Sequence, residues 1–281
     1  MSELLRHARH VVSENPVTGF GFVLFALLLL IAAFGPLMVP HDPLASNAAY
    51  ALTPPSRQFW LGTDQLGRDI LSRIVVAARL DLGIAATAAS LAFVVGTGMG
   101  LAAGYFGGWA DRIISRITDT IMAFPLFVLA MGIVAALGNT IINVVYATAI
   151  IGVPLYARLA RVETHVRREA GYVEAARLSG NSELRIVLVH ILPNIMPIMA
   201  VQASLTLGYT ILNVAGLSFI GLGVRPPSPE WGIMVAEGAS AIISGEWWIA
   251  LFPGLALMLA VFCFNLMGDG LRDIIDPRMR T

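Results

Sequence analysis

Long stretches without a single charged residue constrain this sequence more than any other feature. No charge occurs in residues 16–41, 82–110 or 120–157, and further apolar runs follow. In a bilayer every backbone polar group must be hydrogen-bonded within the protein, so a helix of about 20 apolar residues is needed to cross the roughly 30 Å hydrocarbon core. The chain has 57% hydrophobic and 13% charged residues, against about 25% charged residues in soluble domains. The sequence therefore predicts an all-α integral membrane protein.

Six transmembrane helices are predicted, bounded by charged residues, prolines and a glycine-containing turn. They cover residues 19–39, 82–104, 117–137, 141–157, 195–217 and 249–267. The third and fourth are separated by Gly138-Asn-Thr140, which is a turn sequence. A cleaved signal peptide is the alternative for the first stretch, but the apolar part is too long and no small-x-small cleavage site follows it.

The distribution of arginine predicts how the spans are oriented. Six spans place both termini on one side of the membrane. Thirteen of the eighteen arginines lie in the N-terminal tail, the loop 105–116, the polar segment 158–194 and the C-terminal tail. Because positively charged residues are enriched in cytoplasmic loops, we expect both termini and the polar segment in the cytoplasm.

The polar segment 158–194 predicts an exposed helical elbow between two spans. Glu163 and Arg167 stand four residues apart, as on a solvent-facing helix. Gly180 is a helix stop, and Asn181-Ser182 can cap a second helix that Pro193 bends or ends. Such an elbow is a surface that another protein can grip. The alternative is a solvated loop in which Glu174 merely pairs with Arg177.

Two segments on the opposite side, residues 40–80 and 218–247, are longer than turns. A short helix around residues 70–78 is expected to lie in the membrane interface or to pack against the spans. Residues 232–243 predict another short helix, and Trp231, Trp247 and Trp248 fit an aromatic belt.

Small residues and one carboxylate mark the spans themselves. Gly96, Gly100 and Gly104 recur every four residues, which predicts close helix packing, either inside this protein or against a sister subunit. Asp119 lies just inside the third span, and an ion pair with Arg116, one turn away, is the expected explanation.

Several function classes are excluded or disfavoured by composition. All eighteen basic residues are arginines, so the chain lacks the lysine of a Walker A phosphate loop and does not hydrolyse ATP by that route. The five histidines are scattered without metal-ligand spacing, and no nucleophile–base pattern is visible. Cys263 is expected to be a buried hydrophobe. The formal net charge of zero gives no argument for binding nucleic acid.

The polar segment resembles the EAA signature of ABC importer permeases. The matching residues are Glu174, Ala175 and Ala176, then Gly180, and then Leu192 and Pro193. One departure is His190, which stands where the family pattern usually has isoleucine, although Ile191 lies beside it. The resemblance implies a type I importer fold in which this loop couples the spans to a cytoplasmic ATPase.

Further motifs resemble the C-type subunit of dipeptide/oligopeptide permeases. They are Leu61-Gly-Thr-Asp-x-x-Gly-Arg-Asp-x-Leu-Ser-Arg73, Ala103-Gly-Tyr-Phe-Gly-Gly108, Pro226-Pro-x-Pro-Glu-Trp-Gly232 and Asn265-Leu-Met-Gly-Asp-Gly-Leu-Arg-Asp273. The resemblance implies three parts: residues 1–80 with the first span, the transmembrane domain 81–270 with the coupling loop 158–194, and a cytoplasmic tail 271–281.

The resemblance also implies a location and a set of partners. The location is the bacterial inner membrane, and the partners are a homologous B-type permease, two ATPase subunits and an extracytoplasmic substrate-binding protein. ATP and magnesium would bind those ATPases, with no cofactor on this chain. The candidates for the face that meets the binding protein are Asp64, Arg68, Asp69, Pro226, Glu230 and Trp231, although these residues are equally able to brace the spans.

The function predicted from this resemblance is translocation of di- or oligopeptides, without enzymatic activity on this chain. Related permeases carry glutathione, nickel chelates or oligosaccharides, and the binding protein largely sets the choice. A membrane scaffold that uses the elbow only for docking is the competing hypothesis of another class, and a membrane-embedded hydrolase is weaker because no catalytic pair is visible.

Overall fold

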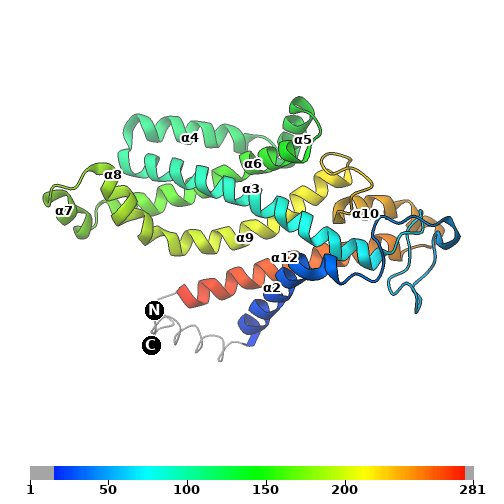
Figure 1. Cartoon of the computed structure of the whole chain (residues 1–281). Helices are drawn as coiled ribbons and strands as arrows, with labels where there is room; N and C mark the ends of the chain where they lie inside the picture. The colour runs from blue at the N-terminus through cyan, green and yellow to red at the C-terminus, as the bar shows by residue number, and fades with distance from the viewer. Residues whose placement is uncertain (1–15, 276–281) are drawn as a thin grey trace.

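The computed structural model describes residues 16–275, and these residues form helices joined by short connections and two longer segments (Figure 1). The α-helices are α2 (Pro16–Phe34), α3 (Ile70–Phe106), α4 (Gly108–Ala123), α5 (Leu126–Leu137), α6 (Ile141–Arg168), α7 (Gly171–Leu178), α8 (Glu183–Arg185), α9 (Leu192–Phe219), α10 (Trp231–Ala239), α11 (Ala241–Ser244) and α12 (Trp248–Ile275). Short 3₁₀ turns cover Gly35–Leu37 and Ala48–Tyr50, and a π-helix covers Ile186–Ile191. Within the described part no β-strand occurs, as the sequence predicts.

The helices are long and apolar enough to cross a membrane. Five of them qualify alone, and a sixth span is obtained if α4 and α5, which meet at 93°, count as one broken span. Five of the six predicted spans are therefore found, with altered boundaries, and the third is found only if the bent pair counts as one span. The predictions on the N-terminal arginines and on Arg278 and Arg280 lie outside the described residues.

Helix α3 is longer than predicted. The expected short helix around residues 70–78 and the span 82–104 form one continuous helix of 37 residues, so a separate interfacial helix is wrong. Asp69 starts it as the N-cap, because its carboxylate accepts a hydrogen bond from the backbone N–H of Ser72. Asp81, taken as a boundary because it is charged, is buried inside the helix bundle instead.

Helices α4 and α5 also differ from the prediction. The expected loop 105–116 is helical from Gly108, and the expected straight span 117–137 is bent at Phe124-Pro125. Pro125 lacks a backbone N–H, and its ring holds Phe124 in an extended conformation, so the helix must break there.

The predicted pair of Asp119 with Arg116 is wrong. Asp119 instead accepts a hydrogen bond of 2.7 Å from Arg158 of α6, and Asp111 on the same helix pairs with Arg161. These residues, which are remote in sequence, meet because α4 packs along α6. The spacing of charges in the sequence does not indicate this packing.

The glycines Gly96, Gly100 and Gly104 face α6 of the same chain. A Cβ atom placed on Gly96 would lie 2.6 Å from the backbone oxygen of Val153, and one on Gly104 would lie 2.5 Å from that of Arg161. These distances leave no room for a side chain. Of the two predicted alternatives, packing within this protein is what the structure contains.

Helices α2 and α12 pack beside α3 and α9. A buried cluster joins Leu82, Ile211 and Phe264 from three of these helices. Helix α12 runs to Ile275, so it continues beyond residue 267, where the sixth predicted span ends. Cys263 is buried, as expected for a small hydrophobe.

Candidate functional site

Two polar regions lie at opposite ends of the helix bundle (Figure 1). At one end is the elbow, residues 169–185, which contains α7 and α8. At the other end lie α10, α11 and the connection 38–69 that precedes α3. Helix α3 runs between the two ends, so a single rigid element contacts both.

Local backbone chemistry shapes the elbow. Gly180 has φ of +79°, a left-handed conformation that a side chain disfavours, and no atom lies within 4 Å of where its Cβ would be. The N–H of Asn181 donates to the carbonyl of Ala176, and the N–H of Gly180 donates to that of Arg177. This is the Schellman arrangement that ends a helix. Ser182 then caps α8 by accepting from the N–H of Arg185. The predicted helix stop and cap are confirmed.

Helix α7 has one buried and one exposed face. Val173 and Ala176 are buried in a cluster with residues of α3, α6 and α9. Glu174 and Ala175 are exposed, and Leu178 is 84% exposed. Among the described residues, the Glu174 side chain has no hydrogen bond or ion pair, and Arg177 binds other groups. The alternative in which Glu174 simply pairs with Arg177 is therefore not what the structure contains.

Tyr105, at the end of α3, ties the elbow to the bundle. Its hydroxyl forms a hydrogen bond with Glu183 and accepts one of 3.3 Å from Arg177. Its backbone oxygen accepts a hydrogen bond of 3.0 Å from Arg168. One residue thus contacts the end of α6, the end of α7 and the start of α8. Tyr105 is not among the predicted site residues; its place in the Ala103–Gly108 motif is the one signal for it in the sequence.

The return from the elbow is a π-helix leading to Pro193. Pro193 has no N–H to give to the carbonyl of Val189, so the regular α pattern cannot pass through it. The N–H of Leu192 bonds instead to the carbonyl of Val187, five residues back. His190 is half-buried, and its backbone oxygen accepts from the amide of Asn194. Leu192 is half-buried and Pro193 is exposed. Helix α9 begins at Leu192 and continues through Pro193, so Pro193 does not end the helix.

At the opposite end, Asp64, Arg68, Arg73 and Glu237 form a charge cluster. Arg68 donates to Asp64 at 2.6 Å and to Glu237 at 3.2 Å, and Arg73 donates to Glu237 at 3.4 Å. Arg73 is 1% exposed. The cluster binds the connection 38–69 to α3 and to α10. The sequence pattern does not predict the role of Glu237, because Glu237 lies 164 residues from Arg73.

The candidates for the binding-protein face are mostly buried. Asp64, Arg68 and Asp69 are 2–4% exposed, and Glu230 and Trp231 are 0% and 2% exposed. Pro226 is exposed. Whether this end meets a binding protein stays a prediction, but the five buried side chains brace the segment in this structure.

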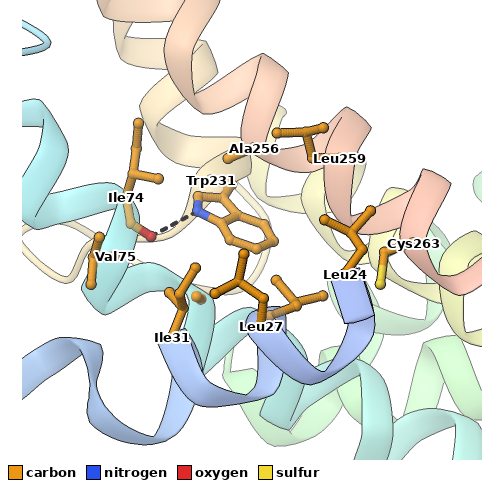
Figure 2. A pocket seen from close by; sticks show the side chains of 11 residues that line it. Leu24, Leu27, Ile31, Ile74, Val75, Trp231, Ala256, Leu259 and Cys263 are labelled. Carbon is orange, nitrogen blue, oxygen red and sulfur yellow. Dashed lines mark hydrogen bonds between the residues drawn. The ribbon is translucent and has the colours of Figure 1, made fainter. Parts of the chain in front are cut away.

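Trp231 anchors α10 to α3 through its side chain. Its indole nitrogen donates to the backbone oxygen of Ile74 at 3.0 Å, beside an apolar pocket of about 220 Å³. Figure 2 shows this hydrogen bond and the apolar side chains of α2, α3 and α12 that line the rest of the pocket. Trp231 is thus an interior residue, and the aromatic-belt interpretation does not apply to it.

Family models match most of the sequence. The model described as "Binding-protein-dependent transport system inner membrane component" matches residues 96–281. The chain belongs to this family. The model described as "N-terminal TM domain of oligopeptide transport permease C" matches residues 3–55 of this permease.

Curated relatives match this permease over nearly its whole length. It is 42% identical over 276 residues to the dipeptide transport system permease protein of Alkalihalophilus pseudofirmus, covering 98% of this chain and 90% of the relative. It is 43% identical over 260 residues to the glutathione transport system permease protein of Pectobacterium atrosepticum, covering 92% and 86%.

The fold also matches a solved structure. The permease resembles a chain of the inward-facing MetNI methionine ABC transporter with a TM-score of 0.58 and 18% sequence identity, covering 72% of this chain and 95% of that chain. This protein is therefore a multi-pass membrane permease with the fold of an ABC importer, and its relatives are transport components rather than catalysts.

Proposed function

We propose that this permease forms half of the pathway through which a binding-protein-dependent importer carries short peptides into the cell. Support for the substrate class comes from the relatives, which are named as dipeptide and di/tripeptide transport permeases. The glutathione transport permeases among them fit the same chemistry, since glutathione is itself a small peptide.

The elbow is the region that we propose couples the permease to an ATPase subunit. Its exposed face combines a carboxylate without a partner in the described structure, Glu174, with Ala175 and the exposed Leu178. Small and apolar side chains can enter a groove on another protein, and the carboxylate can accept charge-assisted hydrogen bonds there. The elbow would sit in a cleft of an ATPase subunit, with ATP and magnesium bound by that subunit. Because the ATPase is cytoplasmic, this docking would place the elbow and both termini of the permease in the cytoplasm. The distribution of arginine predicts the same orientation.

The remaining partners complete the pathway. A homologous B-type permease would supply the other half, two ATPases would bind the two elbows, and a binding protein would deliver the peptide at the α10 end. A groove of about 470 Å³ between α3 and α9, lined by Phe93, Tyr156 and Ser204 among others, is the candidate surface for the pathway or for the sister permease.

The test of coupling is Glu174→Arg combined with Gly180→Pro in the complete transporter. The double change should abolish uptake and ATPase co-purification while the protein stays in the membrane, because it reverses the docking charge and prevents the left-handed turn. Arg225→Glu, an exposed charge reversal at the α10 end, is the control and should leave ATPase co-purification unchanged. Normal uptake by the double mutant would contradict the proposal that the elbow couples the permease to the ATPase.

Measuring ATPase activity with and without a transported peptide distinguishes a transporter from a membrane scaffold. In proteoliposomes that contain the purified complex and its binding protein, a transporter should show ATPase activity that rises when a transported peptide is added. A scaffold should show no such stimulation, even though the elbow still binds its partner.

A further inference from the structure

Two buried carboxyl groups, Asp81 of α3 and Glu230 at the N-terminus of α10, lie apart from the elbow and take no part in the charge cluster of Asp64, Arg68, Arg73 and Glu237. They are 3% and 0% exposed. The backbone N–H of Trp231 donates to Asp81 at 3.0 Å, and the N–H of Ile233 donates to Glu230 at 2.7 Å. Each carboxyl group therefore uses one oxygen to hold the start of α10. We call these two residues the carboxyl pair.

The second oxygen of each group has no partner. Asp81 Oδ1 and Glu230 Oε1 are buried without a hydrogen bond in the described structure, and so is the hydroxyl of Ser218, near the end of α9. The two carboxyl groups lie within hydrogen-bonding reach of each other, and Ser218 lies beside Glu230. Leaving such atoms bare is costly, because a buried acceptor loses water without replacement.

Within residues 16–275 no cation compensates the pair. Among the described residues neither carboxyl group has an ion pair. On α3, Arg73 pairs with Asp64 and Glu237 in the charge cluster, and Arg79 is exposed. Helices α2 and α9 carry no charged residue, and α10 carries only Glu237, which is paired with Arg68 and Arg73. Helix α12, which packs against α10, carries charged residues only in its last two turns, Asp269, Arg272 and Asp273. Two adjacent negative charges would thus be buried alone, which the interior of a membrane protein does not tolerate.

A positive ligand must therefore bind here, and a proton fits better than a metal ion. Calcium takes about 6–8 oxygen ligands and magnesium needs a near-octahedral set, whereas this site offers three bare oxygens. No cluster of three or more acidic, histidine or cysteine side chains suited to a metal occurs among residues 16–275. One proton between Asp81 Oδ1 and Glu230 Oε1 gives both oxygens a partner and removes one charge.

We propose that the carboxyl pair is a proton-binding site, in which a single proton shared by Asp81 and Glu230 fastens α10 to α3. The coupled pair titrates as a unit. Burial raises the pKa of Glu230 from 4.5 to about 7, in the direction that sharing requires. The site is independent of the proposed substrate and of the elbow.

The proton gives a defined dependence of stability on pH. The folded state keeps the proton up to a higher pH than the unfolded chain does. Stability from this site is therefore complete below about pH 4.5, the ordinary value of the glutamate, and is lost as pH rises through the raised folded-state pKa, which for Glu230 is about 7. Asp81→Asn should remove this dependence, because the asparagine amide can donate to Glu230 permanently while its oxygen still accepts from Trp231.

The test is infrared spectroscopy of the full-length chain, purified from membranes with whatever subunits accompany it. At about pH 5, below the raised pKa of Glu230, the wild type should show the C=O band of a protonated carboxylic acid. That band should be lost in Asp81→Asn and in Glu230→Gln and kept in Glu246→Gln, a half-buried control. Between about pH 5 and about pH 8, either side of the raised pKa, the Tm of the wild type should fall, and the Tm of Asp81→Asn should stay flat.

The proposal is overturned if the wild type lacks the band or if the band survives in Asp81→Asn. If the band is missing and sodium or calcium raises the Tm of the wild type but not that of Asp81→Asn, the site binds a metal ion instead of a proton. If Glu230→Gln does not fold, Asp81→Asn alone decides, because it keeps the hydrogen bond to Trp231.

Discussion

The elbow and the charge cluster are built from the same residue types and differ in almost every other respect. At the elbow the side chains of Arg177 and Glu183 are 49% and 52% exposed and their charged atoms lie 3.8 Å apart. In the cluster the side chains of Arg68 and Arg73 are 4% and 1% exposed and share the same two carboxylates. Solvent screens the first set and leaves it available to a partner, whereas the second set is committed to the fold.

This difference separates binding charges from bracing charges. An exposed pair contributes little to stability, because water competes for both groups. A buried pair contributes little when complete, but removing one member leaves the other uncompensated in a dry environment. Mutations of equal size should therefore have very unequal effects at the two ends.

The largest effect is expected for Arg73→Ala in the charge cluster. It leaves Asp64 and Glu237 with one guanidinium instead of two, and loss of a buried partner costs about 3–5 kcal/mol. The measurement is the thermal unfolding of the purified protein, read beside its yield in the membrane. Arg79→Ala, an exposed arginine on the same helix, is the matched control and should unfold near the wild-type temperature. Equal losses in both variants would contradict the bracing role.

A smaller and local effect is expected for Gly180→Ala in the elbow. No atom obstructs the new methyl group, so the cost is the left-handed backbone alone, about 1–2 kcal/mol. Hydrogen exchange of the α7 amides should accelerate while that of α3 does not change, because the strain opens the elbow without unfolding the bundle. Gly171→Ala is the control: its site is equally open and does not have a left-handed φ, so unchanged exchange is expected there.

The elbow was predictable from the sequence because its determinants are local. Gly180 ends a helix and Ser182 begins one through groups within a few residues, and the sequence contains both signals. The cluster was not predictable, since Arg73 and Glu237 meet only after α10 folds back onto α3. Asp119 shows the same limit: a nearby arginine was the sensible partner, and the real one lies 39 residues away.

The apolar spans were predictable from the sequence, and their ends were not. Absence of charge indicates which segments enter the membrane, but Asp81 and Asp69 are charged residues that belong to the packed structure. Treating each charge as an exit from the membrane therefore shortened α3. The break at Phe124-Pro125 could have been predicted from the proline, because the residue before a proline avoids the helical conformation.

A further test asks whether Tyr105 joins the elbow to the bundle. Tyr105→Phe removes the hydroxyl that contacts Glu183 and Arg177 and keeps the buried ring. The expected cost is about 1 kcal/mol, typical of one hydrogen bond, with faster exchange of the α8 amides. Tyr209→Phe is the control, since its side chain is 49% exposed and its hydroxyl has no hydrogen bond in the described structure. Identical exchange in both variants would show that the hydroxyl contact does not hold the elbow.

The smallest effect is expected for the exposed pair of Asp119 and Arg158. Their side chains are 60% and 50% exposed, although the hydrogen bond is short at 2.7 Å. A double-mutant cycle with Asp119→Ala and Arg158→Ala should give a coupling energy of about 0.2–1 kcal/mol, and salt should reduce it. A coupling of several kcal/mol, insensitive to salt, would mean that lipid or a partner subunit covers this pair in the membrane. The pair would then belong with the cluster rather than with the elbow, and burial in the assembled transporter would be the property that separates the two.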